Sequence, residues 1–129
     1  PEAGGAVVHV HSPHATALAC LRQRIPPFHY MVALAGGDDV PVADYATFGT
    51  QALSDHVLAA LEGRRACLLA NHGLITTGSD LEGAISLARE VESLAQQYLL
   101  ARQAGEPVLL DEAEMARVAE RFRDYGPGR

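Results

Sequence analysis

The chain contains no lysine: all ten of its basic residues are arginine. A lysine that forms a Schiff base with a carbonyl substrate is therefore excluded within these 129 residues, and so is the lysine of a P-loop. The arginines are scattered along the chain, and the formal net charge is −6. Nucleic acid and an anionic membrane surface are therefore not expected as partners.

Long apolar runs and abundant cysteine are also missing. No stretch approaches the roughly 20 apolar residues that cross a bilayer, and no signal peptide is visible. Cys20 and Cys67 stand far apart in apolar surroundings, so we expect two buried free thiols in a cytoplasmic protein rather than a disulfide. The length fits one domain with its own core. The chain begins Pro1-Glu2 without methionine, as expected for a fragment or for a chain that has lost its N-terminal part.

The segment 6–11, Ala-Val-Val-His-Val-His, is an apolar β-branched run that predicts a buried strand. Strand side chains alternate between faces, so His9 and His11 point the same way with Cα atoms about 6.5 Å apart. Two buried imidazoles need partners. One metal ion would serve both, and hydrogen bonds to the backbone are the alternative that the pair alone does not exclude. Ser12 and Pro13 then predict a helix start, which places both histidines at the end of the strand.

The rest of the chain alternates between strand and helix signals. Strands are expected at 28–34, 40–42, 66–70 and 74–77, and helices at 50–62, from Ser79 to about Ala104, and from Asp111 onward. Ser79 and Glu82 form a capping box for the longest helix. The expected loop 44–50 carries Tyr45 and Phe48, which line a pocket or simply pack on the sheet.

A third histidine follows the apolar run 66–70, in the sequence Asn71-His72-Gly73. We expect His9, His11 and His72 to surround one ion. Three imidazoles favour zinc or a neighbouring divalent metal, and three protein ligands leave a position for a substrate oxygen. Such an open site is a Lewis acid that polarises a carbonyl group. A metal site of this kind allows a C–C bond beside a ketone to be made or broken without a Schiff-base lysine.

These motifs resemble the class II aldolase/adducin family, and within it the branch of the fuculose phosphate aldolases. The resemblance runs through the whole chain and is carried by 6–11, 26–31, 45–50, 71–75 and 121–126. It implies a three-layer α/β/α fold with a mainly antiparallel central sheet, of which residues 1–129 are the C-terminal portion of a single domain. The acidic residue that acts as base and extra metal ligand, and the loops that bind the substrate phosphate, are then expected outside this chain.

The resemblance also implies roles for individual residues. His9, His11 and His72 match the ligands of a zinc ion, or of another divalent metal. Tyr30 matches a tyrosine that supplies a proton at the aldehyde end of the substrate, acting across a subunit boundary. A phenol is a sensible donor to a nascent alkoxide if it is held close.

Three aromatic residues complete the implied site. Phe48 matches a residue that lines the aldehyde pocket, and Phe122 and Tyr125 match aromatics of a tail that closes over the substrate. A closing tail would exclude water from the reaction.

The implied activity is the reversible cleavage of a ketose 1-phosphate such as L-fuculose 1-phosphate. Its products would be dihydroxyacetone phosphate and an aldehyde such as L-lactaldehyde, and the enzyme a cytoplasmic homotetramer with sites between subunits. A pentulose-phosphate 4-epimerase and a thiosugar-phosphate dehydratase are alternatives within the same superfamily. A non-catalytic, adducin-like oligomerisation domain or an inactive fragment is the alternative outside enzymes, and the presence of the ligand histidines argues against it.

Overall fold

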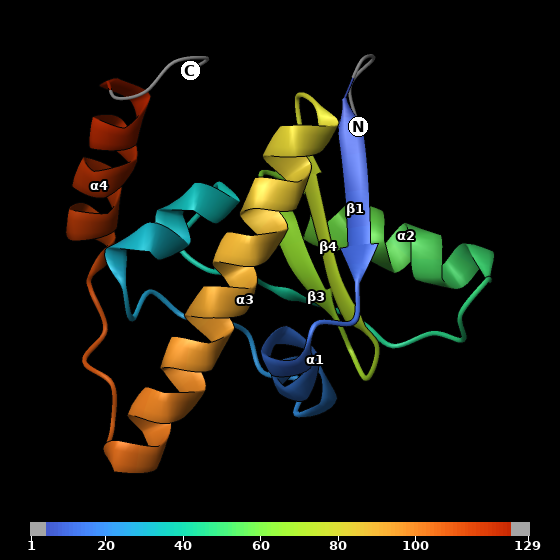
Figure 1. Ribbon diagram of the computed structural model, residues 1–129, viewed down its shortest axis with the longest axis horizontal. Coiled ribbons are helices and arrows are strands. Elements are labelled where there is room, and N and C mark those ends of the chain that lie inside the picture. The colour runs from blue at the N-terminus through green and yellow to red at the C-terminus, as the bar shows by residue number, and fades with distance from the viewer. Residues whose placement is uncertain (1–4, 125–129) are drawn as a thin grey trace.

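A four-stranded sheet forms the centre of the molecule, which the computed structural model describes from residue 5 to residue 124 (Figure 1). The strands, in their order across the sheet, are β1 (Ala6–Val10), β4 (Gly73–Gly78), β3 (Ala66–Leu69) and β2 (Val42–Ala43). β4 is antiparallel to both β1 and β3, and only the short β2 pairs in parallel. The prediction of a mainly antiparallel sheet is confirmed.

Helices cover both faces of this sheet. One layer contains α1 (Pro13–Cys20), the 3₁₀ helix η1 (Tyr30–Ala35), α3 (Leu81–Ala104) and α4 (Glu112–Asp124). On the other side α2 (Gln51–Ala60) packs against β2 and β3 (Figure 1). The fold therefore has the three layers, α/β/α, that the family resemblance implied. In the described residues no helix is both long enough and apolar enough to cross a membrane.

Each face of the sheet has its own apolar cluster. The larger lies under the α1–α3 layer, and its bulky members include Leu18, Ile25, Leu68, Leu74, Leu94 and Met115. The smaller joins Cys67 and Leu69 of β3 to Leu53 and Val57 of α2. Because successive residues of a strand face opposite sides, β3 is buried on both faces, which suits its wholly apolar sequence.

The two cysteines are free thiols, as expected, but only one of them is buried. Burial raises the pKa of Cys67 to about 12, so this thiol stays protonated and unreactive at neutral pH. Cys20 is exposed because it ends α1 on the side turned to solvent, which the apolar neighbours of this residue did not reveal.

The strand predicted at 28–34 is wrong, because this segment forms η1. His29 caps the helix, since its Nδ1 accepts a hydrogen bond from the Met31 N–H at 3.1 Å. The helix ends at Ala35, and Gly36 follows it with a φ of 101°, in the left-handed region that favours glycine. A short apolar run fits a strand or a buried helix equally well, and here the local cap decides for the helix.

Two other elements begin at a different residue from the one predicted. The edge strand expected at 40–42 is β2, which begins at Val42, while Val40 pairs with Ile25 in an isolated bridge. The cap of α3 is Asp80 and not Ser79, since the Asp80 carboxylate accepts the Gly83 N–H at 2.8 Å. A carboxylate at a helix N-terminus also gains from the helix dipole, which a hydroxyl does not.

Candidate metal centre

The histidine-bearing face of β1 looks towards α2. Val8 and Val10 pack against the larger cluster on the opposite face, so the alternation of the strand turns His9 away from it. His9 and His11 are exposed rather than buried, because β1 is an edge strand and α2 covers only β2 and β3. The common orientation predicted for the two imidazoles is confirmed, and their expected burial is not.

His72 reaches the same place from the turn between β3 and β4. The pairing of Val10 with Leu74 sets the start of β4 beside the end of β1. The turn itself is tight: the His72 N–H donates to the Leu69 carbonyl oxygen at 2.9 Å. Asn71 has a φ of 58° and lies in this turn, where asparagine tolerates the left-handed region. Antiparallel pairing thus joins two segments that are far apart in the sequence.

The three imidazoles form a nearly equilateral cluster. The ring centroids of His9 and His11 are 5.0 Å apart, those of His9 and His72 are 4.8 Å apart, and those of His11 and His72 are 4.9 Å apart. One nitrogen of each ring lies within 4.8 Å of the other two. In the part of the chain that the structure describes, no other group of histidine, cysteine and carboxylate side chains is arranged in this way. The donor set is one that can hold a metal ion.

The electrostatics of the cluster favour the form of histidine that binds metal. Desolvation lowers the pKa of His9, and the neighbouring charges of His72 and His11 lower it further. The neutral imidazole is the ligand form, because protonation removes the lone pair. Three converging imidazoles repel one another when they are protonated. When they are neutral, one shared cation can accept a lone pair from each of them. The residues therefore fit a metal, and their role as its ligands stays a prediction.

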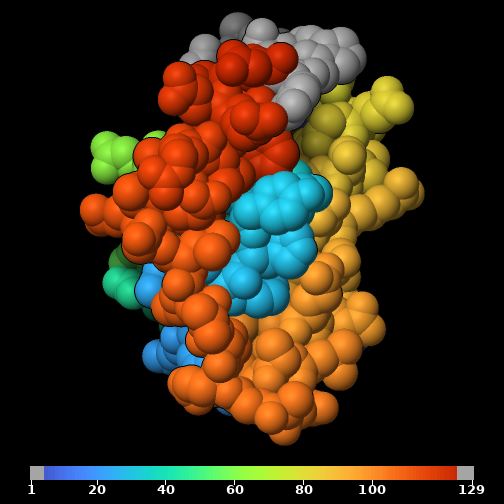
Figure 2. Space-filling view, turned by 90° about the vertical axis from the view of Figure 1, so that its left-hand side faces the viewer, coloured from blue at the N-terminus to red at the C-terminus, as the bar shows by residue number. Residues whose placement is uncertain are grey.

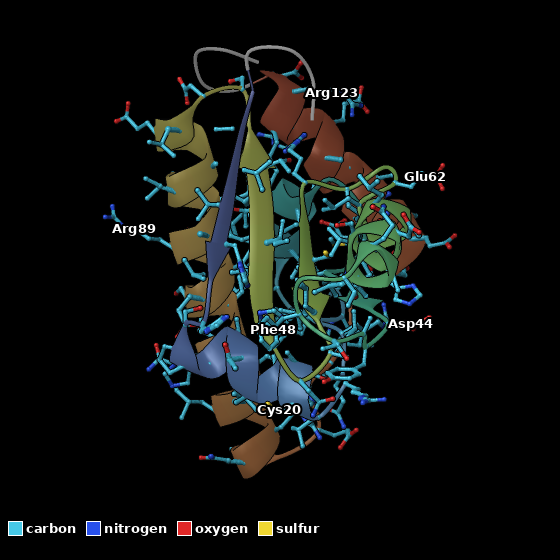
Figure 3. The ribbon with its side chains drawn as sticks, turned by 90° about the vertical axis from the view of Figure 1, so that its right-hand side faces the viewer. Cys20, Asp44, Phe48, Glu62, Arg89 and Arg123 are labelled. Atoms are coloured by element: carbon cyan, nitrogen blue, oxygen red, sulfur yellow. The ribbon has the colours of Figure 1, made fainter. Side chains whose placement is uncertain are left out.

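The cluster opens into a broad groove of about 1810 Å³ between the sheet and α2. Tyr45 and Phe48 line this groove with Leu53 and Val57, so the two loop aromatics belong to a pocket rather than to the packing of the sheet. Phe48 is 78% exposed and lies over the sheet beside α2 (Figure 3). Phe48 therefore lines the same groove as the three histidines, and its role at an aldehyde pocket stays a prediction.

Tyr30 and Phe122 lie elsewhere. Their rings stack with centroids 6.1 Å apart, and the Tyr30 ring also stacks on His29 at 5.0 Å. Figure 2 shows the surface of the η1 segment between α4 and α3, the layer on the other side of the sheet from the groove. Among the described residues, neither Tyr30 nor Phe122 lines the groove. Tyr125 lies outside the described residues.

One carboxylate that contacts the start of α1 has no signal in the sequence. Glu92 of α3 accepts hydrogen bonds from the main-chain N–H of Ala15 at 2.9 Å and of His14 at 3.0 Å, and its Oε2 lies 2.7 Å from His14 Nδ1. It therefore caps α1, which begins two residues after His11. The partner is 78 positions from His14, so only the tertiary structure reveals it.

Residues 2–99 match the family described as the Class II Aldolase and Adducin N-terminal domain. The chain belongs to the class II aldolase/adducin family. It is 60% identical over 122 residues to 5-methylthioribulose-1-phosphate/5-deoxyribulose-1-phosphate aldolase of Rhodospirillum rubrum, over 95% of this chain and 55% of that protein. It is 52% identical over 122 residues to L-fuculose phosphate aldolase of Escherichia coli K12, over 94% of this chain and 57% of the relative.

Solved structures of class II aldolases share the fold. A structure of L-fuculose 1-phosphate aldolase superimposes with a TM-score of 0.88 at 49% identity, over 91% of this chain and 55% of that one. The enzyme of that name from Thermus thermophilus superimposes with a TM-score of 0.67 at 31% identity, over 80% of this chain and 57% of that one. The chain spans just over half the length of the relatives that it matches.

Proposed function

We propose that this chain forms the metal-binding portion of a class II aldolase. The reaction is the reversible cleavage of a ketose 1-phosphate to dihydroxyacetone phosphate and a small aldehyde. One observation carries the proposal: three imidazoles converge at an open groove in a chain that has no lysine for a Schiff base. The names of the similar proteins support the same reaction class.

The substrate is proposed to be a deoxyketose 1-phosphate. L-Fuculose 1-phosphate is the candidate that the sequence motifs suggested, and cleavage would yield L-lactaldehyde. The 60% identity to an aldolase named for 5-deoxyribulose 1-phosphate supports that compound as a second candidate, and its cleavage would yield acetaldehyde. Both candidates share the phosphorylated three-carbon ketone end and differ only in the aldehyde. The same groove would therefore serve both substrates.

The histidines and Phe48 of the groove are proposed to have different roles. His9, His11 and His72 would hold a divalent cation, proposed to be zinc, which supplies Lewis-acid polarisation of the ketone carbonyl when it is bound. Phe48 lies on the open side of the groove, where its ring would shield the aldehyde end from water.

Tyr30 is proposed as the proton donor to the aldehyde oxygen. Its phenol is half exposed and lies on the other side of the sheet from the imidazoles, so within one chain it does not face them. It would therefore serve the groove of a neighbouring copy in a homotetramer. The stacked ring of Phe122 would hold the phenol in place, with Tyr125 following in the same tail.

The remaining parts of the site would come from the rest of the polypeptide. We propose that residues 1–129 are the C-terminal portion of a cytoplasmic enzyme. An acidic base and the phosphate-binding loops would then be provided by the segment that the longer relatives have and this chain does not.

The test is an assay of the protein encoded by the complete gene. L-Fuculose 1-phosphate and 5-deoxyribulose 1-phosphate are supplied separately, and released dihydroxyacetone phosphate is measured. We expect release from at least one substrate, abolished by a chelator and by His72→Ala but retained in His56→Ala, a histidine on α2 outside the cluster. Consumption of substrate without dihydroxyacetone phosphate would instead favour an epimerase or a dehydratase. Full activity in His72→Ala would refute the metal role of the cluster.

A further inference from the structure

Two strained residues of the described chain are bonded to each other. Arg22 and Asn71 are the only residues other than glycine with a positive φ between residues 5 and 124, at 54° and 58°. Arg22 Nε donates a hydrogen bond to Asn71 Oδ1 at 2.7 Å. L-residues are sterically disfavoured in this region, and they persist there where the surrounding structure holds them. The pairing of the two suggests that their side chains are needed where they are.

Arg22 occupies a position that usually belongs to glycine. At the end of α1 the N–H of Gln23 donates to the Leu18 carbonyl at 3.1 Å, and the N–H of Arg22 donates to the Ala19 carbonyl at 3.0 Å. This is the pattern of a Schellman motif, in which glycine avoids the strain. The guanidinium also lies over the Tyr45 ring, 5.6 Å from its centroid. The arginine side chain thus joins the end of α1 to the loop and to the turn that line the groove.

Asn71 immediately precedes His72 in the β3–β4 turn. Its N–H donates to the Ala19 carbonyl at 2.9 Å, the same oxygen that accepts the Arg22 N–H. Two contacts therefore fix the turn to the end of α1, one through the main chain and one through the Arg22 side chain. The rotation of the Asn71 peptide sets the direction in which His72 leaves the turn.

The other end of α1 begins two residues after His11. There Glu92 accepts the N–H groups of His14 and Ala15, so α3 holds the first turn of the helix in place. Helix α1 is thus fixed at both ends, beside His11 at its start and beside the His72 turn at its end. It acts as a rigid spacer between the two segments that carry the imidazoles.

We propose that Arg22 is a positioning residue of the metal centre. Acting through Asn71, it holds His72 at the separation from His11 that capture of a metal ion requires. This inference rests on the metal site of the proposed function. Groups that orient metal ligands commonly change metal affinity 10- to 100-fold when they are removed. The backbone strain of two residues with positive φ is then offset by tighter metal binding at a preorganised cluster.

The experiment is a titration of the full chain with Co²⁺, followed by its visible absorption bands. Arg22→Ala keeps the backbone strain and removes only the side chain, and we expect its Kd for Co²⁺ to rise about tenfold with an altered band intensity. Arg24→Ala is the matched control, because Arg24 is an exposed arginine of the same segment that pairs with Asp39 instead. Its Kd should match that of the native chain.

A second variant tests the route through Asn71. Asn71→Gly keeps the left-handed turn and removes the acceptor of the Arg22 hydrogen bond. We expect the same loss of affinity as in Arg22→Ala, and the double variant should be no weaker than either single one, because both break one interaction. Native affinity in Arg22→Ala, or losses that simply add in the double variant, would overturn the proposal.

A measurement on the metal-free chain separates this inference from the proposed function. Amide hydrogen exchange at Asn71 and His72 should accelerate in Arg22→Ala, while exchange at Val10 of β1 stays unchanged. If the native chain shows no Co²⁺ band, the metal function fails, and exchange alone decides whether Arg22 holds His72. Unchanged exchange at both amides would then refute the positioning role.

Discussion

Gly73 lies directly against His11: a Cβ atom at residue 73 would fall 2.9 Å from His11 Cδ2 and 2.5 Å from the Val10 carbonyl oxygen. The contact with the main-chain oxygen leaves no room for a side chain. Gly73→Ala should therefore displace the end of β1 together with the His11 ring. We expect a loss of stability of about 1–3 kcal/mol, typical of overpacking, and weaker binding of zinc.

The control for this prediction is Gly105→Ala, where an added Cβ would meet nothing within 4 Å. Urea denaturation and a zinc titration on both variants provide the measurement. Equal zinc affinity in the native chain and in Gly73→Ala would show that His11 tolerates the shift, and that the close approach matters only for packing.

The lowered pKa of His9 predicts how the stability of the metal-free chain depends on pH. In the unfolded chain His9 takes up a proton near its ordinary pKa of 6.5, while in the folded chain it does so at lower pH. The unfolded state therefore binds more protons as the pH falls below 6.5, and the free energy of unfolding decreases until the folded-state pKa is passed. Urea denaturation between pH 5 and pH 8 measures this slope, which should become shallower in His9→Asn. An unchanged slope would exclude His9 as its source.

The lowered pKa of Glu92 predicts how the stability of the chain depends on pH in the acidic range. Burial by itself would raise the pKa of Glu92, but the hydrogen bonds from Ala15 and His14 outweigh it and hold the pKa below the ordinary value of 4.5. The stability that the carboxylate contributes is therefore fully present above pH 4.5 and is lost as the pH falls through the folded-state pKa. Glu92→Gln should lower the free energy of unfolding at pH 7 by about 1–2 kcal/mol.

The comparison for Glu92→Gln is Glu120→Gln, on an exposed position of α4. Chemical denaturation at pH 7 and at pH 3 should show a smaller Glu92 effect at the lower pH, because the carboxylate gains protons as the pH falls below 4.5. If the deficit of Glu92→Gln persists undiminished at pH 3, the ionised carboxylate is not what stabilises the start of α1.

The parts of the site that follow local rules could be predicted from the sequence. The period of two along a strand puts His9 and His11 on one face whatever the rest of the fold does. The position of His72 just beyond the end of a strand could also be predicted, because it follows the apolar run 66–70 and precedes a glycine. Its place beside β1 is not a local matter, because it requires the antiparallel pairing of β1 with β4.

The parts that depend on tertiary contacts could not be predicted. Residues 28–34 are apolar enough for a strand, and the His29 cap that makes them helical is visible only once the side chain is placed. The partner of His14 is far away in the sequence, in the middle of α3. The sequence does not distinguish Arg22 from the other arginines, because its positive φ and its hydrogen bond to Asn71 exist only in the folded chain.

The separation of Tyr30 from the imidazoles leads to a test of shared sites. In the complete protein, Tyr30→Phe lacks the proposed donor and His72→Ala lacks a proposed ligand, so each variant alone should have little activity. If each site takes its imidazoles from one subunit and its tyrosine from another, co-refolding equal amounts should restore about a quarter of the native sites, since half of the subunits supply each intact part. Release of dihydroxyacetone phosphate measures the recovery. A mixture that is no more active than its two components would place both residues in a site within one subunit, or remove Tyr30 from the reaction.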